Sequence, residues 1–444
     1  MDASASVDPG VRPLIAAVAM GYGHLRAAHA LADALEERVV QVDRPPLTDG
    51  DEARLWHRVR AAYELASRLS TLPYAGAPLK WLLDEVTSIP ALHPYRDLSQ
   101  PTRGVMTLDR LIRKNLGRGL LEELRRTGRP LLTTFYSPAI LADRAGLDRV
   151  YCVVTDTDVN RIWAPRSPQA TRIRYLVPTP RAAKRLRAYG VPSHRILFTG
   201  YPLPHELVGG PGLELLTRNL AARIVRLDRE GEFRRERREE VAHFLGPLPD
   251  EEEGRPPLLA FAVGGAGAQA TLPGAFLPSM RRDIEAGRLR VALVAGMRPK
   301  VAEVLKGCVK SVGLEGSPGV EILFDEEMGA YFTKMNALLA RTDLLWTKPS
   351  ELCFFGALGL PLILASPVGA HERLNRRWVR EAGAGVKQRD PRFAGEWLGD
   401  MLSEGTLAAA AWAGFMRLPK FGLYRILEAV KDDAVPLQGA SHRA

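Results

Sequence analysis

Short apolar runs alternate with amphipathic segments along most of this 444-residue chain. In the first half, the runs suited to buried strands are residues 14–19, 39–42, 131–136, 149–155, 173–177 and 196–199. Apolar residues at helical spacing lie between them, and predict helices at residues 25–38, 52–83 and 106–126, and from Thr179. Strands and helices in alternation predict a mostly parallel, doubly wound α/β sheet.

The same alternation begins again in the second half. Strands are predicted at residues 258–263, 291–295, 320–324, 344–346 and 360–365, with helices at 274–286, 300–309 and 331–340. A chain of this length is too long for one hydrophobic core. We therefore expect two α/β domains, residues 1–208 and 254–405. A charged helical connection at 209–253 joins them, and a helical segment at 406–444 can return to the first domain.

The composition is that of an ordinary globular protein, with 46% apolar and 25% charged residues. No apolar run is long enough to span a bilayer, and residues 1–10 lack the basic and apolar regions of a signal peptide. These features predict a cytoplasmic protein. Cys152, Cys308 and Cys353 are scattered without metal-ligand spacing, and are expected to be buried thiols in a reducing compartment.

The formal net charge of +10 admits nucleic acid, an anionic membrane face or an anionic small molecule as partner. No helix-turn-helix, zinc-finger or base-stacking signature is visible, so no nucleic-acid partner is expected. Many arginines lie beside acids, as in residues 234–240, which is typical of a solvated helix face.

An aromatic cluster with basic neighbours is spread over residues 68–95. Tyr74, Trp81 and Tyr95, near Arg68 and Lys80, form either an exposed apolar lip or a buried helix between domains. An exposed lip would suit an acceptor or a membrane surface, and predicts weak peripheral association with the inner membrane face.

The first predicted strand leads into Gly21-Tyr22-Gly23-His24 and then into a helix. Glycines at positions 21 and 23 let the backbone approach a ligand closely, and the helix start offers amides to an anion. The field of a helix N-terminus disfavours imidazolium, so His24 is expected to stay neutral and to serve as a base. The alternative is a structural histidine held by hydrogen bonds.

The fourth predicted strand runs into Asp156-Thr157-Asp158. Two carboxylates at this spacing can hold a divalent cation against a diphosphate, because hard cations take oxygen ligands. The alternative is a carboxylate that positions an acceptor hydroxyl.

In the second half, strand 258–263 leads into a glycine-rich turn at residues 264–267. Unhindered amides in such a turn can converge on phosphate oxygens, although the Gly-Lys-Ser/Thr end of a Walker A loop is missing.

Residues 347–377 contain two further strand ends. The predicted order is a strand end, a short apolar helix opening at Pro349, a strand, and a polar loop with His371, Glu372 and Asn375. Ligands of open α/β sheets lie at the carboxyl ends of strands, so this stretch is either a nucleotide site or one more βαβ unit.

Taken in order, these motifs resemble those of two-domain GT-B glycosyltransferases over about four fifths of the chain. The pattern is most similar to monogalactosyldiacylglycerol synthases, processive diacylglycerol glucosyltransferases and the N-acetylglucosaminyltransferase that makes lipid II. The similar blocks are residues 21–28, 155–163, 190–192, 199–202, 264–267, 347–349 and 371–375.

Several positions depart from this pattern. Ser350-Glu351 replaces a Gly-Gly pair, Gly356 aligns with the glutamate that binds the donor ribose, His371 replaces a glutamine and Asn160 a histidine. Glu351 is then either a substitute ligand for the ribose or a cap of the helix N-terminus.

The resemblance implies an α/β fold of GT-B type, with two Rossmann-like doubly wound domains facing a cleft. The first domain would hold the acceptor, and the second the nucleotide sugar. The implied reaction moves a sugar from a nucleotide diphosphate sugar, with UDP favoured, to an acceptor hydroxyl that can belong to a lipid. Transfer would proceed with inversion and without a metal or cofactor, and His24 or Asp156 would take the acceptor proton.

The resemblance and the glycine turn together predict the donor ligands Gly264, Gly265, Ala266, Gly267, Met297, Lys348, Ser350, Glu351, His371, Glu372 and Asn375. Two rival classes stay open. One is a sugar-nucleotide epimerase of the same fold, which would use Glu351, His371 and Glu372 around the sugar. The other is a sugar-nucleotide-binding protein without activity, suggested by the glycine at position 356.

Overall fold

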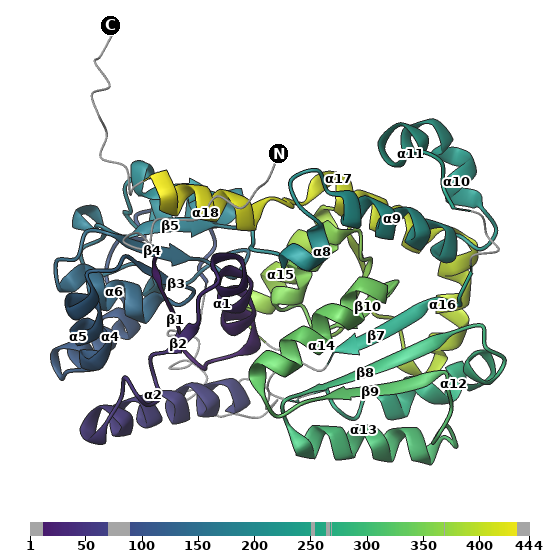
Figure 1. Ribbon diagram of the computed structural model, residues 1–444, viewed down its shortest axis with the longest axis horizontal. Helices are drawn as coiled ribbons and strands as arrows, with labels where there is room; N and C mark the ends of the chain where they lie inside the picture. The colour runs from purple at the N-terminus through teal and green to yellow at the C-terminus, as the bar shows by residue number, and fades with distance from the viewer. Residues whose placement is uncertain are drawn as a thin grey trace, which may run out of the picture. The chain divides into compact units, whose positions relative to one another are not determined.

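The structure is a computed structural model that describes residues 12–69, 89–249, 254–262, 267, 269–367 and 369–432. It contains two compact units, each built on a six-stranded parallel sheet (Figure 1). One unit holds the described residues of Met1–Met20, His24–Pro202 and Phe421–Ala444, and the other holds those of Gly21–Gly23 and Leu203–Lys420. None of the described helices is long and apolar enough to cross a membrane.

The sheet of the first unit has the order β2-β1-β3-β4-β5-β6, and all of its ladders are parallel. Its strands are β1 (Leu14–Ala17), β2 (Val39–Gln41), β3 (Leu131–Thr133), β4 (Val150–Val153), β5 (Arg174–Val177) and β6 (Ile196–Phe198). The winding reverses between β1 and β3. In open parallel sheets, the crevice at such a switch point, outside the carboxyl ends of the strands, is where ligands bind.

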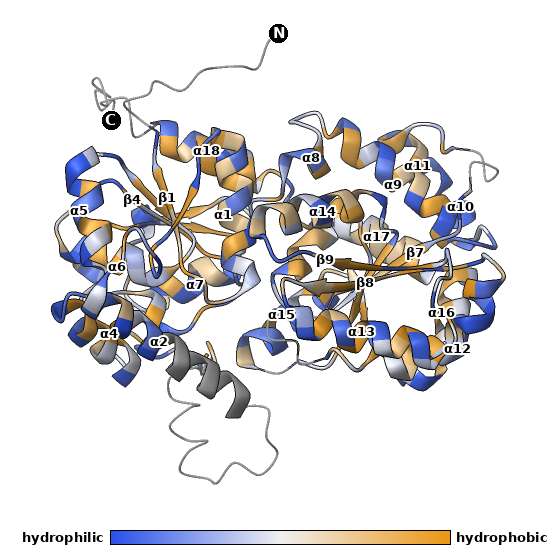
Figure 2. Ribbon diagram, turned by 60° about the horizontal axis from the view of Figure 1, so that its bottom comes forward, coloured by the Kyte–Doolittle hydropathy of each residue, from blue (hydrophilic) through white to orange (hydrophobic). Residues whose placement is uncertain are grey.

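The α-helices of this unit are α1 (Tyr22–Leu35), α2 (Gly50–Leu69), α4 (Arg103–Arg113), α5 (Arg118–Thr127), α6 (Tyr136–Arg144), α7 (Pro180–Ala188) and α18 (Gly422–Asp432). Short 3₁₀ turns are η2 (Arg161–Trp163), η3 (Pro168–Ala170) and η4 (Ser193–Arg195). The strands β1, β3 and β4 are fully buried, as their apolar runs predict. In both units the hydrophobic faces of the helices turn toward hydrophobic strands (Figure 2).

The sheet of the second unit has the order β12-β11-β10-β7-β8-β9, again with parallel ladders throughout. Its strands are β7 (Leu258–Ala262), β8 (Arg290–Gly296), β9 (Val320–Phe324), β10 (Leu344–Thr347), β11 (Leu362–Leu364) and β12 (Gly385–Lys387). This is the Rossmann strand order, with its switch point between β7 and β10. The doubly wound α/β class predicted for both halves is confirmed.

The longer helices of the second unit are α9 (Glu214–Leu227), α12 (Pro273–Glu285), α13 (Pro299–Ser311), α14 (Met328–Arg341), α15 (Ala370–Glu381), α16 (Ala394–Ser403) and α17 (Thr406–Arg417). The shorter ones are α8 (His205–Val208), α10 (Glu232–Glu236), α11 (Arg238–Leu245), η6 (Glu351–Leu358) and η7 (Pro391–Phe393). In this division the charged stretch from residue 209 belongs to the second unit, where α9 packs against α17. The helical segment 406–444 was expected to be able to return to the first domain. Of its two described helices, α18 belongs to the first unit and α17 to the second.

Several predictions are corrected. The helix expected at 106–126 is two helices, because Asn115 and Gly117 adopt φ of 66° and 85°, a left-handed backbone that a right-handed helix cannot contain. The helix expected at 52–83 begins at residue 50, and its part beyond residue 69 lies outside the described residues, as do Tyr74 and Trp81. The expectation of three buried thiols holds for Cys152 and Cys353, whereas Cys308 is only half-buried.

Residues 349–375 also differ from the prediction. The short helix is a 3₁₀ helix that begins at Glu351, not an α-helix opening at Pro349. The predicted polar loop is the start of α15, with Gly369 in the extended conformation at its N-cap. His371, Glu372 and Asn375 therefore sit on a helix, and helical geometry decides which of them turn inward.

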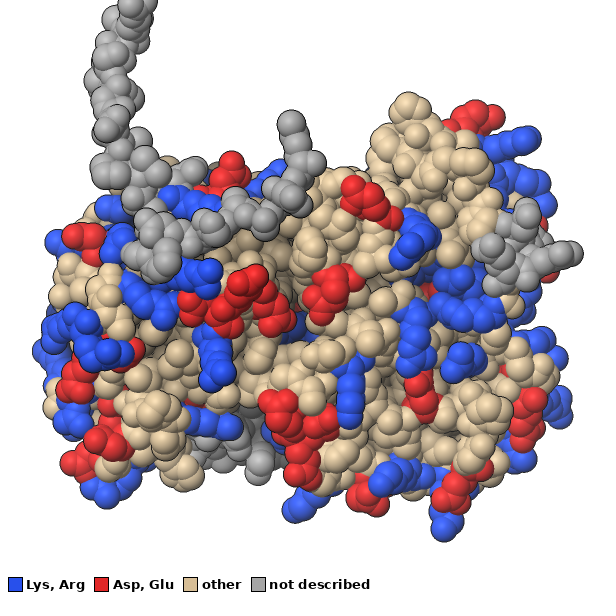
Figure 3. Space-filling view, in the orientation of Figure 1, with Lys and Arg blue, Asp and Glu red and all other residues tan. Residues whose placement is uncertain are grey.

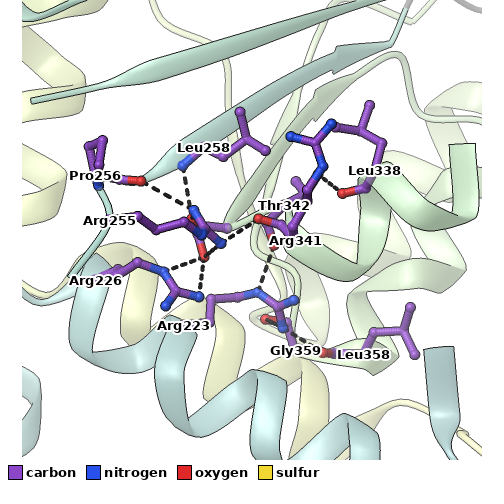
Figure 4. Close-up of polar contacts among 11 residues, drawn as sticks. Arg223, Arg226, Arg255, Pro256, Leu258, Leu338, Arg341, Thr342, Leu358 and Gly359 are labelled. Carbon is purple, nitrogen blue, oxygen red and sulfur yellow. Dashed lines mark hydrogen bonds and ion pairs between the residues drawn. The ribbon is translucent and has the colours of Figure 1, made fainter. Parts of the chain in front are cut away.

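A buried carboxylate ties the amino ends of β7 and β10 together. Asp343 accepts hydrogen bonds from Arg226 (2.8 Å), Arg255 (2.6 Å) and the Leu258 backbone N–H (2.8 Å). The Asp343 N–H donates in turn to the Leu258 carbonyl (3.0 Å). Figure 4 shows Arg226 and Arg255 close to each other beside Leu258. The side chain of Asp343 is fully buried, so these donors offset the cost of removing its charge from water.

Candidate functional site

The glycine turn after β1 places His24 in the first turn of α1. The helix begins at Tyr22, three residues earlier than predicted. Gly21 has φ of 121°, which a residue with a side chain rarely adopts. Nothing lies within 4 Å of the place a Cβ would occupy there, so the backbone conformation, not the available space, requires this glycine.

The imidazole of His24 is held by groups that follow the two neighbouring strands. Its Nδ1 lies 2.9 Å from the Thr134 carbonyl oxygen, after β3, and 2.8 Å from Thr155 Oγ1, after β4. A carbonyl oxygen can only accept a hydrogen bond, so Nδ1 carries the proton in the neutral ring and the lone pair lies on Nε2. Thr134 Oγ1 also donates to the His24 carbonyl (2.8 Å), which couples α1 to the end of β3.

Aromatic rings fix the orientation of this imidazole. Phe135 meets it edge-on at 4.7 Å between ring centroids, and Trp163 lies at 6.1 Å. Tyr136 contacts both of those rings. His24 is half-buried in this cluster, so the ring is confined while a part of it stays accessible.

Asp156 and Asp158 have different surroundings. Asp156 follows Thr155 directly and is half-buried. Asp158 is fully buried, and both of its oxygens accept from arginines of α7: Arg185 at 2.8 and 2.9 Å, and Arg181 at 2.7 Å. Its Oδ1 also accepts from the Val159 N–H (2.9 Å). These bonds occupy the carboxylate, so Asp158 is built into the fold instead of facing a ligand.

Two buried tyrosines fasten the rest of this loop. The Tyr189 hydroxyl donates to the Val159 carbonyl (2.9 Å), and the Tyr175 hydroxyl donates to the Trp163 carbonyl (2.7 Å). Burial raises the pKa of both phenols, which keeps each hydroxyl protonated and able to donate. The loop from Asp156 to Trp163 is therefore held in its middle, at Val159, and at its end, at Trp163.

Within the described ranges, no group of three His, Cys, Asp or Glu side chains is placed to hold a metal ion. A paired Asp156–Asp158 site would need Asp158 to give up its two arginines. Breaking such a buried ion pair costs about 3–5 kcal/mol.

In the second unit, the segment after β10 lies at the switch point. Thr347 Oγ1 donates to the Ala262 carbonyl at the end of β7 (3.3 Å). Lys348 Nζ pairs with Glu372 Oε1 at 2.6 Å, and Asn375 Nδ2 donates to the Pro349 carbonyl (3.1 Å). Glu372 and Asn375 are almost fully buried, so α15 orients the segment that carries Lys348.

The remaining predicted donor residues are placed unevenly. Ser350, Glu351 and Met297 are half-buried after the ends of β10 and β8, and His371 is exposed on α15. Gly267 adopts φ of 70°, where a Cβ would come within 2.9 Å of the Val301 side chain. Gly264, Gly265 and Ala266 lie outside the described residues.

Gly356 does not occupy a ligand position. A Cβ there would meet Leu418 at 3.0 Å and Ala384 at 3.4 Å, both in the core of the unit. A glutamate at this position would enter that core, so position 356 of this chain does not face a ligand. Its alignment with the ribose glutamate of the resembling enzymes stays a prediction.

Sequence reasoning missed the residues that orient the candidate groups. Thr134 was assigned to the interior of a strand over 131–136, although β3 ends at Thr133. The signal available was the Thr133-Thr134 pair, since strand ends carry the polar groups that face a ligand. Arg181 and Arg185 had no local signal, because their partner lies more than twenty residues away.

A scan against protein-family models and a search of curated proteins found no match. Among solved structures, the chain is similar to a Listeria monocytogenes protein assigned as a UDP-N-acetylglucosamine 2-epimerase. The TM-score is 0.51 at 14% identity, covering 95% of this chain and 97% of that chain.

Two other similar structures are the Neisseria meningitidis UDP-GlcNAc 2-epimerase bound to UDP-GlcNAc and the calicheamicin glycosyltransferase CalG4. Their TM-scores are 0.49 and 0.47 at 11% and 14% identity, over 94% and 96% of this chain and 99% and 100% of theirs. Together with the two sheets, the Listeria structure shows that this chain has the GT-B fold.

We expect Asp158→Asn to lower the free energy of unfolding of the first unit by about 3 kcal/mol, because it leaves Arg185 buried without its counter-charge. Asp156→Asn in the same loop is the control, with an expected change below about 1 kcal/mol. Denaturant unfolding measures both.

Wild-type protein should melt at the same temperature with and without EDTA. A chelator-induced loss of stability that manganese restores would favour the metal interpretation.

Proposed function

We propose that the chain is a GT-B enzyme that acts on a nucleotide diphosphate sugar and transfers the sugar to an acceptor hydroxyl. The observation that carries this proposal is the His24 geometry: a glycine turn, a helix start, and an Nδ1 that donates to a backbone carbonyl. This arrangement suits a general base acting through Nε2, at the edge of the sheet where ligands bind. The fold supports the class of enzyme but does not select the activity.

In the proposed step, the acceptor oxygen bonds to the anomeric carbon as the bond from that carbon to the diphosphate oxygen breaks. The acceptor proton passes to His24 Nε2, and the sugar inverts. The imidazolium formed keeps its Nδ1–H bond to the Thr134 carbonyl, whose partial negative charge favours the protonated ring. Asp156 is the alternative acceptor of this proton, or positions the hydroxyl.

On the donor side, we propose that Lys348 and the amides of residues 264–267 stabilise the leaving diphosphate. The ion pair with Glu372 supports this role, because it holds the lysine at the switch point. We assign Glu372 and Asn375 to positioning, and Met297, Ser350, Glu351 and His371 to direct contact with the nucleotide sugar. A UDP sugar is favoured, and the step uses no metal.

A lipid acceptor and weak association with the inner membrane face remain part of the proposal. Tyr95 supports it, because 74% of its surface is exposed and Lys184 lies beside its ring at 4.8 Å. An aromatic ring with an adjacent cation is suited to the membrane interface.

A GT-B epimerase is the second candidate, favoured by the similarity to the Listeria structure. Incubation with labelled UDP sugars, with and without candidate acceptors, separates the possibilities. Acceptor-dependent release of UDP with a labelled product supports transfer. Interconversion of the sugar without an acceptor supports epimerisation, and binding without either supports a non-catalytic protein. Absence of binding to every nucleotide sugar overturns the proposal.

We expect His24→Ala to lower turnover by about a hundred- to ten-thousand-fold, the usual contribution of a positioned base. Nucleotide affinity should stay nearly unchanged, because the substituted group takes up a proton and does not bind the nucleotide. His29→Ala, on the same helix, is the matched control and should keep turnover near wild type. Steady-state rates and calorimetry measure the two effects. Near-normal turnover in His24→Ala would remove this residue from the mechanism.

We expect Glu351→Gln to weaken nucleotide binding by about tenfold or more, equivalent to about 1.4 kcal/mol, with little change in melting temperature. The reason is that a carboxylate at the N-terminus of η6 can accept hydrogen bonds from a ribose. Glu303→Gln, at an exposed position, controls for the loss of one charge. Calorimetry and melting curves together decide the role. Unchanged affinity with lowered stability would make Glu351 a helix cap.

A further inference from the structure

A second concave site lies at the opposite end of the second unit's sheet from the proposed donor residues. A cavity of about 300 Å³ is bounded by the end of α9, by residues 254–257 leading into β7, and by Gly287 and Arg288 before β8. Because β7 and β8 are parallel, their amino ends meet here, whereas Lys348 and Glu351 follow the carboxyl end of β10. This cavity is therefore distinct from the proposed nucleotide-sugar site.

Half of the residues that line this cavity are arginines: Arg226, Arg229, Arg234, Arg255 and Arg288. Lys and Arg side chains gather on this face, over α9 and the start of β7 (Figure 3). Arginine guanidinium groups bind phosphate in a bidentate manner, and they do so more strongly where water is partly excluded. We call this site the arginine cavity.

The arginine cavity keeps a positive excess after its ion pairs are counted. Among the described residues, Asp343 pairs with Arg226 and Arg255, Asp228 pairs with Arg234, and Asp283 pairs with Arg288. Arg229 is exposed and has no side-chain hydrogen bond or ion pair to a described residue. Counted over the described residues alone, five guanidinium groups face three carboxylates, and Arg234 makes a further interaction besides its pair with Asp228. Residues 250–253, all acidic in the sequence, lie outside the described residues.

A sixth arginine lies behind the cavity. Arg223 is buried and donates to the carbonyl oxygens of Thr342 (3.1 Å), Leu358 (2.8 Å) and Gly359 (3.1 Å), as Figure 4 shows. Burial is the main reason that the pKa of Arg223 is lowered to about 10; the charge of Asp343 raises it, and the charges of Arg226 and Arg255 lower it. A cation this deep, next to two others, adds to the positive field of the cavity.

Two of the lining arginines are already oriented. Asp343 takes one guanidinium edge of Arg226 and of Arg255, and Arg255 also donates to the Arg341 carbonyl (2.5 Å). A guanidinium group has five N–H donors, so Arg226 keeps further donors, whereas Arg255, which also donates to the Pro256 carbonyl (3.2 Å), keeps only its Nε–H. Their side chains therefore lose little conformational freedom when an anion binds.

We propose that the arginine cavity binds the phosphate group of a phosphorylated ligand, independently of the proposed nucleotide-sugar site. The structural alternative is that these arginines only hold α9 to the sheet. That role accounts for Arg226 and Arg255, which clamp Asp343, but not for Arg229 at the rim. The shared chemistry is a phosphate, carried either by a soluble molecule or by a lipid headgroup.

The test compares two doubly substituted proteins with the full-length wild type. Arg229→Ala/Arg288→Ala removes rim arginines and leaves the Asp343 clamp intact. Arg54→Ala/Arg126→Ala removes two exposed, paired arginines of the first unit, and so matches the loss of charge. Pyrophosphate is titrated by calorimetry at physiological ionic strength. Flotation with phosphatidylcholine vesicles, with and without phosphatidic acid, forms the second arm.

We expect the rim variant to bind pyrophosphate at least tenfold more weakly than wild type, or to lose its flotation with phosphatidic acid vesicles, while the control keeps both. Weakened pyrophosphate binding alone identifies a soluble phosphate ligand. Lost vesicle flotation alone identifies a lipid headgroup. Equal behaviour of rim and control variants in both arms overturns the proposal, including where wild type binds neither probe. Because the comparison rests on the two variants, failure of the nucleotide-sugar activity does not affect it.

Discussion

The hydrogen bond from His24 Nδ1 to the Thr134 carbonyl depends on one constraint, the parallel pairing of β1 with β3. The carboxyl ends of neighbouring parallel strands lie at the same edge of a sheet. Residues that follow β1 and β3, more than a hundred positions apart in the sequence, therefore lie next to each other there. The parallel pairing of β3 with β4 brings Thr155, after β4, to the same imidazole nitrogen. The tautomer of neutral His24 is therefore a consequence of sheet topology, because the carbonyl group at Nδ1 can only accept a hydrogen bond.

The second unit uses the two ends of its sheet differently. At the carboxyl ends, Lys348 is held by Glu372, and the loop after β10 is held by Asn375. At the amino ends, Asp343 gathers arginines whose charge exceeds its own. The pair of Lys348 with Glu372 has one charge of each sign, and it keeps the lysine in place for a ligand. The cluster around Asp343 has more positive than negative charges, so it attracts anions. Both features rest on parallel ladders that bring distant segments together.

The alternation of apolar runs predicted the six strands of the first sheet and five of the six strands of the second, because strands buried on both faces are continuous apolar segments. It missed β12, a three-residue strand that is not buried and carries no apolar run. The prediction from apolar spacing failed at residues 106–126. Asn115 and Gly117 have a left-handed backbone, which interrupts a helix that the spacing of apolar residues alone would continue. His24 could be singled out from its glycine turn. Its partners could not, since strand register decides which carbonyl faces the ring.

Hydrogen exchange of the full-length protein with and without UDP tests the central claim most directly, namely that the carboxyl end of the second sheet binds a nucleotide. At a UDP concentration of about 100 times Kd, binding contributes about 2.7 kcal/mol, which slows exchange about a hundredfold for amides that must open to exchange. We predict slowed exchange at residues 347–351 and 369–375, with residues 255–258 at the amino end unchanged. Unchanged exchange at the carboxyl end, or protection confined to the amino end, would contradict the account.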